Sequence, residues 1–191
     1  MTEPRVLVLV EGRSDAAVVV VLAERAGLPA AGWRLLPMGG ATNASGVLRH
    51  LAVRPPVVLG LCDEHEAPHL HRALTGPDDA VLVCEADLED ELLRALGDDA
   101  VLEVLAATGD LRSFRTLQGQ PQHRGRPVDR QVHRFIAAGA GRKERIDAAL
   151  AARLPPGAEP PPLRALLARI RLECGHAGPA RPADGVSPDP A

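Results

Sequence analysis

Short runs of apolar residues alternate with amphipathic segments over the first half of the chain. Four apolar runs, bounded by proline, glycine or acidic residues, predict buried strands at residues 5–10, 33–38, 57–62 and 80–84. The segments between and after them have helix caps and mixed polarity, and they predict helices at residues 15–26, 45–51, 65–74 and 87–96. Strands that alternate with helices in this way are typical of a parallel sheet covered by helices, so we predict an α/β fold.

The second half of the chain lacks strand patterns. Helices are predicted at residues 100–107, 111–117, 128–138, 142–154 and 162–172, and proline-rich turns separate the last two. The end of the chain is rich in proline, glycine and alanine and has little to bury, which predicts a disordered tail. We therefore expect an α/β domain over residues 1–97, a helical extension over 98–172 and a tail over 173–191.

Composition narrows the class of protein. The chain has 191 residues, of which 46% are hydrophobic and 25% charged, as in ordinary globular proteins. Its apolar runs are far shorter than the roughly 18–20 residues that a membrane helix needs, and no secretory signal pattern begins the chain, so we expect a cytoplasmic protein. The three cysteines lack zinc-like spacing. With two phenylalanines, one tryptophan and no tyrosine, a module that stacks bases on aromatic rings is disfavoured.

Charge is distributed unevenly although the net charge is only −3. Residues 60–110 contain 14 acidic and two basic side chains, whereas residues 112–145 contain nine basic and two acidic ones. Lys143 is the only lysine among the 22 basic residues. An acidic centre followed by a basic segment permits a metal site beside a phosphate-binding surface, although solvated helix faces would give the same pattern.

Acidic residues follow three of the four predicted strands directly. They are Glu11, Asp63 and Glu85, and Asp15, Glu66, Asp87 and Glu89 come close behind them. Because the carboxyl ends of parallel strands meet at one sheet edge, these carboxylates would repel one another unless cations or protons neutralised them. Carboxylate oxygens suit Mg²⁺ or Mn²⁺, and two such ions can bracket a phosphodiester oxygen. Helix capping could explain some of these acids, but it does not explain Glu11.

Four segments in this order resemble the motifs of a known family. They read LVEGRSD at residues 9–15, MGGATN at 38–43, GLCD at 60–63 and DLEDEL at 87–92. Together they are similar to the TOPRIM domain of OLD-family (overcoming lysogenization defect) nucleases, in a short form without the ATPase domain. The resemblance covers residues 5–97, and the helical part to about residue 172 is similar to that family's C-terminal extension. It implies a Rossmann-like parallel fold and Mg²⁺-dependent phosphodiester chemistry.

The resemblance also assigns roles to residues of this chain. Glu11 and Asp15 would bind one ion, and Asp63 would bind a second together with Glu66, Asp87 and Glu89. Glu11, Asp63 and Lys143 would be catalytic, with the lysine stabilising charge on the phosphoryl group. Phosphate or nucleic acid would contact Gly12, Gly39, Gly40 and Arg142, although the glycines could equally serve turns alone.

One position departs from the family pattern. Many TOPRIM proteins have Asp-x-Asp after the third strand, whereas this chain has His65 at the position of the second aspartate. Imidazole is a poor ligand for Mg²⁺, so either Glu66 substitutes for the aspartate or the site prefers a softer ion such as Mn²⁺. His123 and His133 lack metal-like spacing, and we interpret them as surface or helix residues.

Three functions remain in competition. The leading hypothesis is a nuclease that uses two Mg²⁺ or Mn²⁺ ions, with arginines of residues 112–145 holding the nucleic-acid backbone. The sequence has no P-loop, so any ATP dependence would need a separate ATPase, and a homodimer would suit cleavage of two strands. The alternative is a catalytically degenerate module that binds nucleic acid or a partner protein. A primase-like nucleotidyl transferase would need more template-binding surface, and a topoisomerase would need a tyrosine.

Overall fold

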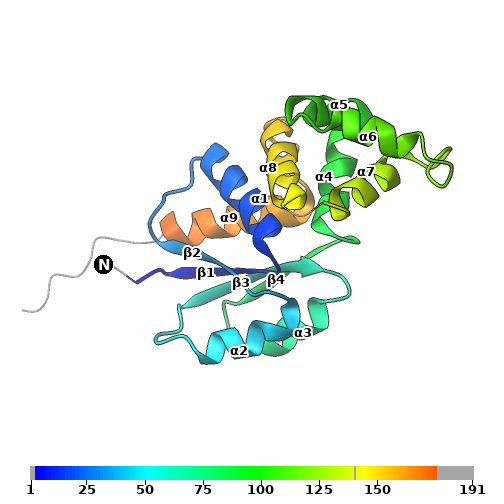
Figure 1. The fold of residues 1–191 in the computed structure, drawn as a ribbon. Helices are drawn as coiled ribbons and strands as arrows, with labels where there is room; N and C mark the ends of the chain where they lie inside the picture. Colours follow the sequence, from blue (N-terminus) through cyan, green and yellow to red (C-terminus); the bar gives the residue numbers. More distant parts are fainter. Residues whose placement is uncertain (1–2, 140, 176–191) are drawn as a thin grey trace, which may run out of the picture.

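A parallel sheet forms the centre of the computed structural model, which describes residues 3–139 and 141–175 (Figure 1). Its strands are β1 (Val6–Val10), β2 (Trp33–Pro37), β3 (Val57–Asp63) and β4 (Ala80–Cys84). Within the described residues the strand order is β2-β1-β3-β4, and every pair is parallel. Each strand lies within one residue of its predicted bounds, and the predicted α/β class is confirmed. All carboxyl ends of the strands therefore lie at one edge of the sheet.

Two helices cover one face of the sheet. They are α2 (Ala44–Arg49), which follows a short 3₁₀ turn η1 (Ala41–Asn43), and α3 (Ala67–Ala73). Side chains alternate along a strand, so Leu7 and Leu9 of β1 pack towards these helices whereas Val6, Val8 and Val10 pack towards the opposite face. Burial on both faces explains why β1 appears in the sequence as an unbroken apolar run.

The opposite face of the sheet is covered by helices from both ends of the chain. These are α1 (Arg13–Arg25) and α9 (Pro161–Gly175), and α8 (Arg142–Arg153) packs on α1 rather than on the strands. The last helix returns to pack on β1, β3 and β4, and its Leu163 and Ile170 are fully buried. One hydrophobic cluster joins the sheet to the helical extension, so the two predicted parts share a core. Helix α9 extends three residues beyond the predicted boundary at 172, and residues 176–191 of the predicted tail lie outside the described part.

The remaining helices form a group beside the carboxyl edge of the sheet. They are α4 (Leu88–Leu96), α5 (Asp98–Ala107), α6 (Leu111–Gln118) and α7 (Val128–Ala137), as Figure 1 shows. The Asp87 side chain caps α4 by accepting a hydrogen bond from the amide of Asp90 at 2.8 Å. Phe114 of α6 meets Phe135 of α7 edge to face, with ring centroids 5.5 Å apart. The predicted helical extension is thus confirmed.

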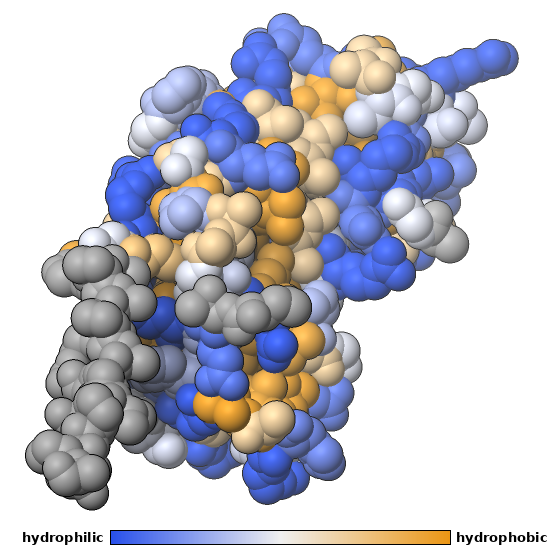
Figure 2. Space-filling model, turned by 90° about the vertical axis from the view of Figure 1, so that its left-hand side faces the viewer, coloured by the Kyte–Doolittle hydropathy of each residue, from blue (hydrophilic) through white to orange (hydrophobic). Residues whose placement is uncertain are grey.

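The outer surface carries few large apolar side chains. Among the described residues, those that are clearly exposed are Val20, Val53, Val83 and Leu172. Figure 2 looks at the side of the molecule where β1 begins, and hydrophobic residues form a strip there between hydrophilic ones. In the part of the chain that the structure describes, none of the helices has the length and apolar character needed to cross a membrane.

Candidate metal and phosphate site

A cavity of about 230 Å³ opens at the carboxyl edge of the sheet. Its charged lining residues are Glu11, Asp15, Asp63, Asp87 and Lys143. The three residues predicted to be catalytic therefore line one cavity, although Glu11 directly follows β1, Asp63 ends β3 and Lys143 lies in α8. Glu85, the third acid at a strand end, instead pairs with Arg94 at 3.1 Å and is largely exposed.

Glu11, Asp63 and Glu66 form a compact group of carboxylates. One oxygen from each lies within 4.8 Å of the others. The adjacent strands β1 and β3 bring Glu11 and Asp63 together, and Asp63 Oδ1 accepts a hydrogen bond from the amide of Glu66 at 2.9 Å. His65 is exposed and does not belong to this group. Glu66, and not His65, therefore lies beside Glu11 and Asp63.

The electrostatics of this group favour a bound cation. Burial and the nearby charges of Glu66, Asp15 and Asp63 raise the pKa of Glu11 to about 7. Glu66 Oε2 is buried and has no hydrogen-bond partner among the described residues. A divalent cation would neutralise the repulsion and satisfy this oxygen. Because carboxylate oxygens are hard ligands, the donor set fits Mg²⁺ or Mn²⁺.

Asp15 lies at the start of α1 and caps it. Its Oδ2 accepts a hydrogen bond from the amide of Gly12 at 2.8 Å, and burial raises its pKa. The side chain lines the cavity, but it is not one of the three carboxylates that come within 4.8 Å of one another. A shared ion between Glu11 and Asp15 therefore stays a prediction.

Gly39 and Gly40 form hydrogen bonds with the backbone of Glu11. Their amides donate to the carbonyl oxygen of Glu11 at 2.9 and 3.2 Å, and their φ angles are 69° and 114°. Such positive φ angles favour glycine, which explains both residues as parts of a turn. Because these amides are already used by Glu11, a direct contact between the turn and phosphate stays a prediction.

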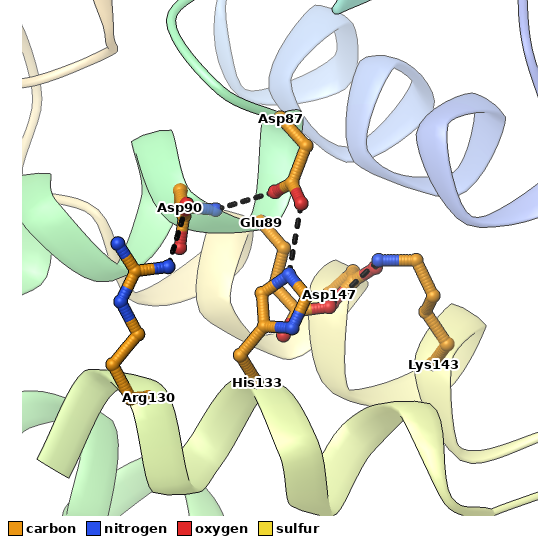
Figure 3. Close-up of polar contacts among 7 residues, drawn as sticks. All are labelled: Asp87, Glu89, Asp90, Arg130, His133, Lys143 and Asp147. Carbon is orange, nitrogen blue, oxygen red and sulfur yellow. Dashed lines mark hydrogen bonds and ion pairs between the residues drawn. The ribbon is translucent and has the colours of Figure 1, made fainter. Parts of the chain in front are cut away.

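Lys143, near the start of α8, points towards two acids (Figure 3). Its Nζ lies 2.7 Å from Glu89 Oε2 and 3.1 Å from Asp147 Oδ2. Burial alone would lower the pKa of Lys143, but the charges of Asp147 and Glu89 raise it. Glu89, a predicted metal ligand, does not line the cavity. Asp147 is not among the residues predicted from the sequence, although its i,i+4 spacing to Lys143 is a signal that could have indicated the contact.

A second group, which consists of two acids and a histidine, joins the start of α4 to α7. His133 Nε2 lies 2.8 Å from Asp87 Oδ2, and single atoms of Asp87, Asp90 and His133 come within 4.8 Å of one another (Figure 3). His133 is a helix residue, as predicted, but it is half-buried and contacts an acid of the cavity. No local pattern in the sequence indicates this contact, because its two residues are on different helices.

Arg142 packs against α7 and away from the cavity. Its guanidinium lies 4.0 Å from the centre of the Phe135 ring, and Nη1 donates to the Phe135 carbonyl oxygen at 2.7 Å. Arg142 also forms an ion pair with Asp110, in which the two atoms are 3.7 Å apart. These contacts anchor the start of α8, and the predicted phosphate contact of Arg142 stays a prediction.

The strand order, the acidic edge and the returning helix define a Rossmann-like α/β domain with a helical extension. More particularly, the chain has the TOPRIM-like fold seen in the C-terminal region of OLD proteins, as the motifs predicted. The C-terminal region of the Burkholderia pseudomallei OLD protein matches at TM-score 0.62 and 16% identity, over 91% of this chain and 100% of that one. The C-terminal region of the Xanthomonas campestris pv. campestris OLD protein matches at TM-score 0.62 and 20% identity, over 92% and 98%.

No protein-family model and no curated protein sequence matches the chain. The similarity to these solved structures, at identities of 16% and 20%, establishes the shared fold.

Proposed function

We propose that this protein is a metal-dependent nuclease that hydrolyses phosphodiester bonds at the cavity on the carboxyl edge of the sheet. The observation that carries the proposal is the convergence of Glu11, Asp63 and Lys143 on one cavity, with Glu66 in the same carboxylate group. Acids next to a single ammonium group are the side chains that metal-assisted phosphoryl chemistry requires.

Each residue has a distinct role in this proposal. Glu11, Asp63 and Glu66 would hold one Mg²⁺ or Mn²⁺ ion. Asp15 and Asp87 line the cavity together with Glu11 and Asp63, and they would hold a second ion. Two such ions, when bound, supply an activated water and neutralise the phosphate. Lys143 would place its positive charge near the phosphoryl oxygens, where negative charge develops in the transition state.

Nucleic acid is the proposed substrate, held through its phosphates. The side chains of Arg112, Arg126 and Arg134 are exposed and have no polar partner among the described residues. Arginines of this kind bind the backbone without reading the bases, so affinity should fall steeply with salt. We further propose that any ATP dependence comes from a separate ATPase and that a homodimer presents two sites to two strands.

The proposal is tested by incubating the protein with supercoiled plasmid and with single-stranded RNA in Mg²⁺, Mn²⁺ or EDTA. Glu11→Ala and Asp63→Ala should abolish cleavage, and Lys143→Ala should reduce it by about 10²–10³-fold. Glu24→Ala is the matched control, because Glu24 is an exposed acid at the far end of α1. Cleavage in EDTA, or full activity of Glu11→Ala, would contradict the proposal. An inert wild-type protein that still binds nucleic acid would favour the degenerate binding module.

A further inference from the structure

Lys143 lies between two acids that are buried behind it. The side chains of Glu89 and Asp147 are 1% and 4% exposed, whereas that of Lys143 is 44% exposed. Only the lysine of these three lines the cavity. Glu89 comes from α4 and Asp147 from α8, so acids of two helices hold the lysine where it lines the cavity.

The cluster is poorly explained as a device for stability. Two buried carboxylates share one ammonium group, and Glu89 Oε1 and Asp147 Oδ1 are buried without hydrogen-bond partners among the described residues. Apolar side chains of similar size commonly stabilise a protein as much as, or more than, a buried ion pair does. What the cluster provides is a fixed position for Lys143 Nζ.

A metal ligand has to present an oxygen to the ion. Glu89 Oε2 accepts from Lys143 at 2.7 Å, and among the described residues Glu89 belongs to neither group whose possible ligand atoms come within 4.8 Å of one another, nor does it line the cavity. Asp87, two residues earlier, does line the cavity. Asp87 and Glu89, which the resemblance predicts to be ligands of one ion, therefore have different environments.

We infer that Glu89 and Asp147 are positioning residues, which hold Lys143 Nζ at the wall of the cavity, and that Glu89 is not a metal ligand. The catalytic part of this inference rests on the proposed nuclease function. The positioning itself is a property of the fold and can be measured without any substrate.

The sequence offers a direct probe, because Lys143 is its only lysine. Protein labelled with ¹³C at lysine Cε should give one side-chain NMR signal, whose titration reports the environment of the ammonium group. Glu89→Gln and Asp147→Asn should each lower the pKa that this signal reports. Asp110→Asn is the control, since Asp110 pairs with Arg142 and Arg145 of α8 and not with Lys143. An unchanged Lys143 titration in both test variants would overturn the inference.

Metal binding and catalysis supply two further readouts. Glu89→Gln should keep the rise in melting temperature that Mn²⁺ gives the wild type, whereas Asp63→Ala should lose it. If the nuclease is active, Glu89→Gln should lower kcat about tenfold or more, with KM little changed, and should have no further effect in a Lys143→Ala background. If Glu89→Gln lost the rise in melting temperature with Mn²⁺, Glu89 would be a metal ligand, and the inference that it is not one would be refuted. An inert wild type with the expected NMR result would refute only the nuclease.

Discussion

His133 of α7 and Asp87 of α4 are joined by a contact of 2.8 Å between Nε2 and Oδ2. The contact links the helical extension to the edge of the cavity, because Asp87 lines it. Burial opposes charge on both groups, but their mutual contact prevails, so the pKa of His133 is raised and that of Asp87 is lowered. The pair therefore favours the folded state when both groups are charged.

The stabilisation by this pair should depend on pH in a defined window. It is lost as pH falls through the lowered pKa of Asp87 and as pH rises through the raised pKa of His133. His133→Ala should therefore be less stable than wild type at pH 5.5 and similar to it at pH 9. Because the side chains are 36% and 38% exposed, we expect a difference of at most about 1 kcal/mol.

Urea unfolding in EDTA at the two pH values measures this difference. His65→Ala is the control, since His65 is exposed and has no polar side-chain partner within the described segments. An equal loss of stability at pH 5.5 and pH 9 would show that His133 acts through packing alone.

Glu11 should make the metal-free protein less stable as pH rises. Its pKa is raised to about 7, so the folded state holds a proton that the unfolded state has already lost between about pH 5 and pH 7. Glu11→Gln removes this penalty and should melt several degrees above wild type at pH 8 in EDTA, since 1 kcal/mol is worth about 2–4 °C in a domain of this size. Adding Mn²⁺ should raise the melting temperature of wild type more than that of the variant. A wild type that melts higher than Glu11→Gln in EDTA at pH 8 would contradict the assignment.

Gly60 permits close packing of α3 on the sheet. A Cβ at this position in β3 would overlap Leu70 Cδ2 and approach Leu74 Cδ2 to 3.4 Å. Leu70 is fully buried and has little room to move. Gly60→Ala should therefore destabilise the protein by about 1–3 kcal/mol, measured by thermal or urea unfolding.

Gly46→Ala is the matched control for that substitution. In α2 the added Cβ would meet only Arg49 Nη2, at 4.0 Å. Alanine is the better helix former, so this variant should be as stable as wild type or slightly more stable. Equal stability of Gly60→Ala and Gly46→Ala would show that α3 makes room for the added methyl group without a loss of stability.

Helix α9 should be essential for folding. It packs on β1, β3 and β4, and removing it would expose the face of the sheet that carries Val8. A chain that ends at Leu154 should not unfold cooperatively, whereas one that ends at Gly175 keeps the whole helix and serves as the control. A sharp thermal transition in the shorter chain would show that the α/β domain folds without α9.

The sequence by itself determined the elements and their broad arrangement. Residues 6–10 are buried on both faces of the sheet, so every position is apolar and the strand can be predicted from the local sequence alone. The positions of Glu11 and Asp63 were predictable for a related reason. An acid directly after a parallel strand must lie at the carboxyl edge, wherever that strand falls in the sheet.

The tertiary structure decided which side chains meet. That Glu66 rather than His65 joins Glu11 depends on the turn after β3, and that Glu89 binds Lys143 while Asp87 faces the cavity depends on how α4 packs on α8. Such partners lie far apart in the chain, and their meeting is set by the packing of helices. Local patterns record burial and helix or strand periodicity, but they do not record which distant side chain lies opposite.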